Sequence, residues 1–83
     1  MARYLNPPDK ITEVGRRLTA IAYDDLLRQL RNGEVLVGLY DRYVFKNAVW
    51  LDSREEYEHF EEHSQGYCSR VGFYAAPFEI FAS

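Results

Sequence analysis

The chain has 83 residues, 47 % of them hydrophobic and 28 % charged, with a formal net charge of −3 at pH 7. These values are typical of one small globular domain and argue against a second domain or disorder over most of the chain. The sequence has no stretch of roughly 18 apolar residues that could span a membrane, and no Lys/Arg cluster dense enough for direct nucleic-acid binding.

Residues 1–9 are predicted to form an extended lead-in to a single domain that covers residues 1–83. Asn6, Pro7 and Pro8 favour an extended or turn conformation. Asn6 or Asp9 can then cap a following helix, where proline is tolerated at the first position.

The next segment gives a mixed signal. Apolar residues recur at helical spacing, at Ile11, Val14, Leu18 and Ile21. Gly15 and several β-branched residues oppose one continuous helix. Whether residues 11–23 form a helix, or include a strand over residues 17–23, stays open at this point.

Residues 25–32 are predicted to form a helix with Asp24 as its N-cap. Leu26, Leu27 and Leu30 share one side of this segment. Gly33 follows at the usual C-terminal position, where a left-handed conformation ends a helix.

Two strands are expected next. Residues 34–40 alternate in the two-residue period of a strand, and Asp41-Arg42 suits a turn or bulge. Residues 43–51 are rich in Val, Phe, Tyr and Trp on both faces. This second strand is therefore either central in the sheet, or interrupted by a hairpin turn at Lys46-Asn47.

The C-terminal third is predicted to hold one helix and one strand. Asp52 or Ser53 can cap the helix, which ends at Gly66 and turns Tyr57, Phe60 and Ser64 inward. Residues 67–81 are expected to be extended, with Pro77 at an edge or bulge.

Two architectures fit these elements. The first is an α+β domain in which an antiparallel sheet packs on two or three helices, with one face of the sheet covered. The second takes residues 17–23 as a strand and gives the ferredoxin-like order βαββαβ.

One short sequence matches the pattern of a metal-binding motif. His59 and His63 are four residues apart in an H-x-x-E-H sequence, so both imidazoles can face one ion from the same helix. A third ligand and a walled cleft are not evident. We expect a solvated helix face, with a Zn²⁺ site at His59 and His63 as the alternative.

No catalytic arrangement is recognisable. Cys68 lies next to only one basic residue, Arg70, and is better explained as a small strand residue than as a nucleophile. The sequence also contains no G-x-S-x-G, C-x-x-C or glycine-rich phosphate loop. We therefore expect a protein that is not an enzyme and has no cofactor.

Charge and aromatic content indicate an interaction protein. Residues 47–83 hold two basic and seven acidic residues, and six of the acids fall between Asp52 and Glu62. The seven tyrosines exceed what a small core needs, and Tyr and Arg supply much of the binding energy at interfaces. The residues expected to form the interface are Tyr40, Arg42, Tyr43, Phe73, Tyr74, Phe78 and Phe81.

The sequence therefore predicts a protein-interaction or regulatory module that associates with itself or with another protein. The contact is expected at the aromatic C-terminal strand, whose exposed edge needs to be covered. One alternative is a small-molecule or metal-binding domain that uses the helix of His59 and His63. A second is an acidic inhibitor of a nucleic-acid-binding partner.

The expected location is the cytoplasm. Cys68 is the only cysteine and cannot form an internal disulfide, which favours a reducing compartment. The N-terminal segment has no apolar run typical of a signal peptide, and no membrane association is expected.

Overall fold

The computed structural model describes residues 3–5, 8–42, 45–67 and 70–81, and describes side chains over residues 11–39, 51–62 and 72–80. Within these residues the element order is βαβαββαβ, followed by a 3-10 helix. The elements are β1 (Arg3–Leu5), α1 (Pro8–Val14), β2 (Arg16–Leu18), α2 (Tyr23–Arg28), β3 (Glu34–Arg42), β4 (Phe45–Trp50), α3 (Arg54–Tyr67), β5 (Arg70–Pro77) and the 3-10 helix η1 (Phe78–Phe81).

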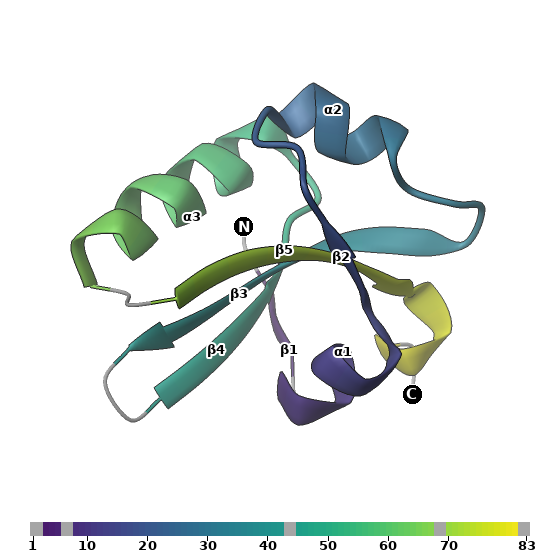
Figure 1. Cartoon of the computed structure of the whole chain (residues 1–83), viewed down its shortest axis with the longest axis horizontal. Coiled ribbons are helices and arrows are strands. Elements are labelled where there is room, and N and C mark those ends of the chain that lie inside the picture. Colours follow the sequence, from purple (N-terminus) through teal and green to yellow (C-terminus); the bar gives the residue numbers. More distant parts are fainter. Residues whose placement is uncertain (1–2, 6–7, 43–44, 68–69, 82–83) are drawn as a thin grey trace.

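The described strands form one five-stranded antiparallel sheet in the order β1-β4-β3-β5-β2 (Figure 1). The protein is therefore a small α+β domain with an antiparallel sheet. From β2 to β5 the elements follow the βαββαβ order along the chain. The ferredoxin-like alternative was nevertheless wrong, because β3 and β5, the second and fourth of these strands, lie in the centre, where a ferredoxin-like sheet has the first and third. Helix α2 connects β2 to β3 across β5, and α3 connects β4 to β5 across β3.

Helices lie on both faces of the sheet (Figure 1). Helices α2 and α3 pack on one face, where Leu36 joins a core cluster with Leu26 and Phe60. On the other face Ile11 of α1 packs against Val37. The expectation that only one face is covered was wrong, because β3 carries apolar side chains on both of its sides.

The N-terminal segment combines the two predicted alternatives. Residues 8–14 are helical and residues 16–18 form the edge strand β2, so the strand is shorter and earlier than residues 17–23. A Cβ atom at Gly15 would lie 2.5 Å from the Ile11 carbonyl oxygen, so a glycine is needed where α1 turns into β2. The lead-in is part of the fold, since β1 pairs with β4 and Pro8 already begins α1.

Strand β4 lies between β1 and β3, as its apolar faces predicted for a central strand. Lys46 pairs with Asp41 and Asn47 pairs with Tyr40. The alternative of a hairpin turn at Lys46-Asn47 was therefore wrong. The turn at Asp41-Arg42 was also wrong, because β3 continues to Arg42.

Helix α2 is shorter than predicted and has a different start. It begins at Tyr23, and its N-cap residue Ala22 makes no side-chain capping bond. Asp24 lies in the first turn and accepts a hydrogen bond from Arg54 at 2.6 Å, so its carboxylate is engaged with α3. The helix ends at Arg28, four residues before the expected end.

Helix α3 starts as predicted. The Ser53 hydroxyl accepts a hydrogen bond from the Glu56 N–H at 3.2 Å, and Glu56 accepts one from the Asp52 N–H at 3.3 Å. This is close to a capping box. The helix runs to Tyr67, one residue past the expected end at Gly66, and none of the described helices is long and apolar enough to cross a membrane.

The C-terminal segment differs from the prediction in two ways. Strand β5 lies between β3 and β2, so it is an interior strand and its edges are paired. It ends at Pro77, which removes a backbone donor, and residues 78–81 form η1 instead of more strand. The expectation of an uncovered C-terminal strand edge was therefore wrong.

Gly38 provides a test of the packing between β3 and α3. A Cβ atom at Gly38 would lie 2.6 Å from Cε2 of Phe60, a ring that is only 4 % exposed. We expect Gly38→Ala to lower the free energy of unfolding by about 1–3 kcal/mol through overpacking. Urea unfolding followed by circular dichroism measures this loss.

Phe60→Leu supplies the control, because the smaller side chain leaves room for the added methyl group. In the Phe60→Leu background, Gly38→Ala should cost at least about 1 kcal/mol less than in the wild type. Additive losses in the double variant would contradict the proposed contact between Gly38 and the Phe60 ring.

Candidate functional site

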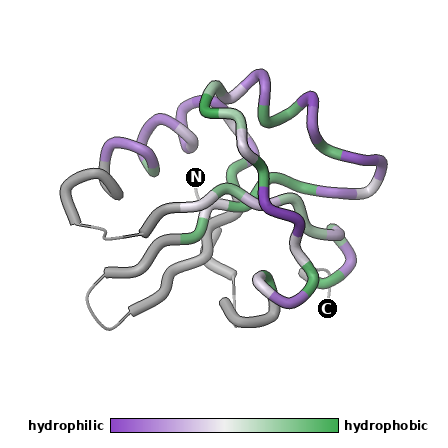
Figure 2. The backbone as a smooth tube through the Cα atoms, in the orientation of Figure 1, coloured by the Kyte–Doolittle hydropathy of each residue, from purple (hydrophilic) through white to green (hydrophobic). Residues whose placement is uncertain are grey.

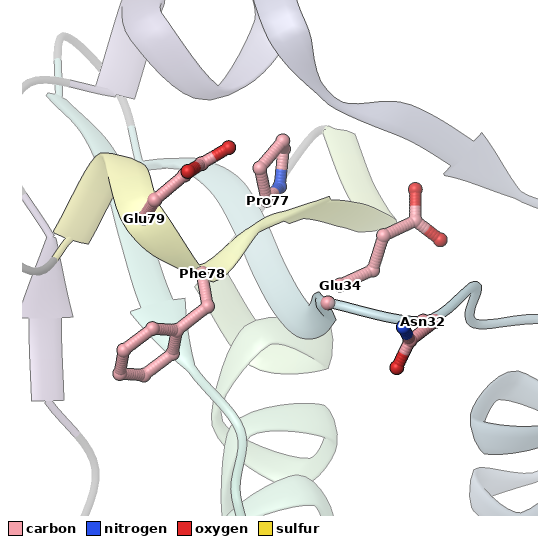
Figure 3. A pocket seen from close by; sticks show the side chains of 6 residues that line it. Asn32, Glu34, Pro77, Phe78 and Glu79 are labelled. Carbon is pink, nitrogen blue, oxygen red and sulfur yellow. The ribbon is translucent and has the colours of Figure 1, made fainter.

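A shallow hollow of about 420 Å³ lies where the turn between α2 and β3 meets the junction of β5 and η1 (Figure 3). We call it the 33/78 hollow. One wall is formed by residues 32–34 and the other by residues 77–79. The Phe78 side chain is 44 % exposed at this position.

The two walls are joined through the backbone. The Phe78 N–H donates a hydrogen bond to the Gly33 carbonyl oxygen at 2.8 Å, and Glu34 pairs with Pro77 at the adjacent end of the sheet. Gly33 has a φ of 87°, which glycine adopts without strain. The hollow is therefore framed by ordered backbone at the end of two central strands.

Four residues fix the wall formed by the turn. Oε1 of Glu34 accepts hydrogen bonds from the Arg31 N–H at 2.6 Å and from Nη2 of Arg16 at 2.7 Å. Nη2 of Arg16 also donates to the Gln29 carbonyl oxygen at 2.5 Å. This Glu34 network (Arg16, Gln29, Arg31 and Glu34) ties the edge strand β2 to the end of α2 and the start of β3. The Gln29 N–H still bonds to the Leu26 carbonyl oxygen of α2, whereas the Gln29 carbonyl oxygen and the Arg31 N–H bond outside the helix.

The network sets the charge state of Glu34. Burial alone raises the pKa of this carboxyl group. The hydrogen bonds from Arg31 and Arg16, with their positive charges, outweigh burial and hold the pKa of Glu34 below its usual value. Glu34 is therefore an ionised structural anchor at neutral pH.

The residues that line the hollow are Asn32, Gly33, Glu34, Pro77, Phe78 and Glu79. The arrangement offers an aromatic ring, a proline and the exposed Glu79 carboxylate to a ligand.

Phe73, which was expected at an interface, is partly buried and packs against the core cluster, and its interface role stays a prediction. Its ring centroid lies 5.3 Å from that of Tyr57 and 5.7 Å from that of Phe60. Tyr23 adds a further ring 5.3 Å from Tyr57. Phe73 is partly buried and packed against the core cluster, so it supports the fold.

Tyr57 anchors the segment before α2. Its hydroxyl donates a hydrogen bond to the Ile21 carbonyl oxygen. Burial first, and then the hydrogen bond and charge of Glu61, raise the pKa of Tyr57 to about 12. The hydroxyl therefore stays protonated at neutral pH and acts as a structural donor.

Tyr74 lies on the face of the sheet that α1 covers and is half-buried there. The Arg17 guanidinium carbon lies 5.9 Å from the centroid of its ring, and Nη1 of Arg17 donates to the Tyr74 hydroxyl at 3.4 Å. This contact joins β2 to β5. An interface role for Tyr74 stays a prediction.

Several predicted site residues lie outside the described side chains. Tyr40 and Arg42 belong to β3, His63 to α3 and Phe81 to η1, but only their backbone is described. Tyr43 and Cys68 lie wholly outside the described residues. Among the predicted interface residues with described side chains, only Phe78 lines the hollow.

The polar face of α3 carries His59. Its side chain is exposed, as are those of Glu55, Glu58 and Glu62, while Tyr57 and Phe60 face the core. Figure 2 shows the hydrophilic character of the described part of this helix. The inward stripe of Tyr57 and Phe60 is confirmed; an inhibitor function for the acidic face stays a prediction.

The zinc hypothesis gains no support from the described part of the chain. No group of three or more His, Cys, Asp or Glu side chains there is placed to hold a metal ion. His63, the second proposed ligand, has no described side chain. A Zn²⁺ site at His59 and His63 therefore stays a prediction.

Local sequence patterns do not predict most of the hollow. The Asn32-Gly33 dipeptide is a turn signal as well as a signal for a helix end. The pair of Arg16 and Glu34 has no local signal, because 18 residues separate them. Only the folded arrangement of β2 and β3 brings them together.

Comparison with known proteins gives no relative. No protein-family model, no curated protein and no solved structure matches the chain. A function can therefore be proposed only from the geometry of the site.

The depressed pKa of Glu34 predicts acid sensitivity. Its folded-state pKa is below the unfolded value, so its stabilisation is present above pH 4.5 and is lost as the pH falls through the folded pKa. At pH 7, Glu34→Gln should lower the free energy of unfolding by about 1.5–3 kcal/mol, the value of hydrogen bonds to a charged group. The variant and the wild type should converge as the pH falls through the folded-state pKa of Glu34, as measured by urea unfolding across pH.

Glu79→Gln is the matched control, because Glu79 is exposed and lies outside the Glu34 network. Its effect on stability should be small at every pH. A loss in Glu34→Gln that does not shrink as the pH is lowered, down to the acid unfolding of the wild type, would show that the ionised carboxylate is not the stabilising group.

Proposed function

We propose that this protein is a non-enzymatic interaction module that associates with itself through the rim of the 33/78 hollow. The observation that carries the proposal is the position of Phe78, an aromatic side chain 44 % exposed beside a hollow of about 420 Å³. The contact surface therefore differs from the strand edge expected from the sequence, because both edges of β5 are paired.

The geometry supports binding at this place. Aromatic side chains that enter a pocket dominate the energy of many interfaces. The bond from the Phe78 N–H to the Gly33 carbonyl oxygen holds the backbone on which the ring is carried. Association then costs little ordering of the main chain, which favours affinity.

The composition bears on the cellular compartment of the module and on the charge of its surface. A single cysteine is usual in a protein of a reducing compartment, and we place the module in the cytoplasm. Its surface is acidic overall, with a net charge of −3, so the contact must overcome a modest mutual repulsion between copies.

Self-association is tested by native mass spectrometry and sedimentation of the untagged chain across a concentration series. The wild type should form a concentration-dependent dimer. Phe78→Ser should raise the dimer dissociation constant about 30-fold, equal to the roughly 2 kcal/mol of a central aromatic residue. Asn32→Trp, which fills the hollow from the other wall, should weaken the dimer as well.

Ile21→Ser is the matched control. Ile21 is 83 % exposed but precedes the start of α2, whereas the hollow lies beyond the end of that helix. Its replacement should leave the dissociation constant unchanged. A wild type that remains monomeric at every concentration, or a dimer insensitive to both Phe78→Ser and Asn32→Trp, would refute the proposal.

A further inference from the structure

We infer that the second copy docks on the hollow with two-fold symmetry, so that Arg31 of each copy faces Glu79 of the other. This inference rests on the proposed self-association and specifies its geometry. It follows from the charges beside the hollow and from the rules of symmetric contacts.

The two walls of the hollow differ in charge. Arg31 stands at the start of the turn that forms one wall, directly before Asn32, and its side chain is exposed. Glu79 belongs to the other wall, and its side chain is also exposed. Among the described side chains neither residue has an ion-pair partner within 4.0 Å.

Glu34 lines the turn wall, and its carboxylate is engaged by Arg16 and by the Arg31 N–H. The positive charges of Arg16 and Arg31 both act on this one negative charge, so the turn side is net positive. The η1 wall carries the negative charge of Glu79, next to Phe78. Figure 3 shows the Phe78 and Glu79 side chains leaving η1 in different directions. Phe78 can therefore enter the hollow of a second copy while Glu79 faces a positive charge at the rim of that hollow.

A two-fold contact makes this pattern self-complementary. In an isologous interface, if one residue contacts a second residue of the partner, the second contacts the first in the other copy. Placing the turn wall of one copy against the η1 wall of the other gives two Arg31–Glu79 contacts. Placing like walls together would oppose two arginines and two glutamates, which complementary interfaces avoid.

Two charge reversals test the inference. Arg31→Glu sets a carboxylate against the partner's Glu79, and Glu79→Arg sets a guanidinium against the partner's Arg31. Each variant alone should raise the dimer dissociation constant at least about 10-fold, because like charges then face each other twice. In an equimolar mixture of the two variants, the mixed dimer holds one contact between the two introduced side chains and one between the two native ones, both of opposite charge. It should form within about 3-fold of the wild-type affinity.

A control pair of charge reversals changes the net charge of the chain by the same amounts, but at residues outside the hollow. Arg17→Glu and Glu58→Arg alter exposed residues on β2 and α3. Neither variant should weaken the dimer as strongly as its counterpart at the hollow, and their mixture should show no preference for mixed dimers. Native mass spectrometry separates the mixed dimer from the two homodimers by mass.

The outcomes separate the inference from the proposed function. A wild type without any dimer refutes both. A wild-type dimer that Phe78→Ser disrupts, but whose charge-reversed variants form no preferred mixed dimer, refutes the two-fold Arg31–Glu79 contact and leaves the interaction at the hollow intact. Preferred pairing of Arg31→Glu with Glu79→Arg, absent from the control pair, confirms the inference.

Discussion

One oxygen of Glu34 accepts hydrogen bonds from both the Arg31 N–H and the Arg16 guanidinium, and the structure around the hollow depends on this anchor. Hydrogen bonds to a charged group contribute roughly 1.5–3 kcal/mol each when partly buried. That is a large share for a domain of this size, whose stability is only about 4–12 kcal/mol. The network bonds the segment after α2 to the start of β3 on both sides of Gly33, whose carbonyl oxygen accepts the Phe78 N–H.

The sheet imposes the second constraint, because β3 is apolar on both faces and both must be covered. Helices α2 and α3 cover one face through Leu26 and Phe60, while α1 and η1 cover the other through Ile11 and Ile80. Using η1 as a cover fixes where β5 ends and so places Phe78 and Glu79 beside the turn at Gly33. The same packing that completes the second core layer thus produces the hollow.

Local patterns predicted the parts of the fold that local physics determines. The two-residue period of residues 34–40, the cap at Ser53 and the inward stripe of Tyr57 and Phe60 all depend on neighbours in sequence, and the structure has them. The end of α2, the interior place of β5 and the hollow depend on contacts between distant segments. Arg16 and Glu34 are 18 residues apart, and no periodicity or motif connects them. Phe78 was predicted for an interface as part of an uncovered C-terminal strand, whereas the fold places it in η1 beside the hollow.

If the Glu34 network holds both walls of the hollow, loss of the carboxylate must loosen both. Amide hydrogen exchange of Arg31 and Phe78 in the wild type and in Glu34→Ala tests this, because the Phe78 N–H reports on the 77–79 wall, whereas the hydrogen bonds of the Glu34 carboxylate go to Arg16 and Arg31. We expect both amides to lose protection together in Glu34→Ala, by about 10-fold for each 1.4 kcal/mol of local stability lost, while the amide of Val37 in the centre of β3 loses less. A Phe78 amide that keeps its full protection while that of Arg31 is lost would contradict the claim.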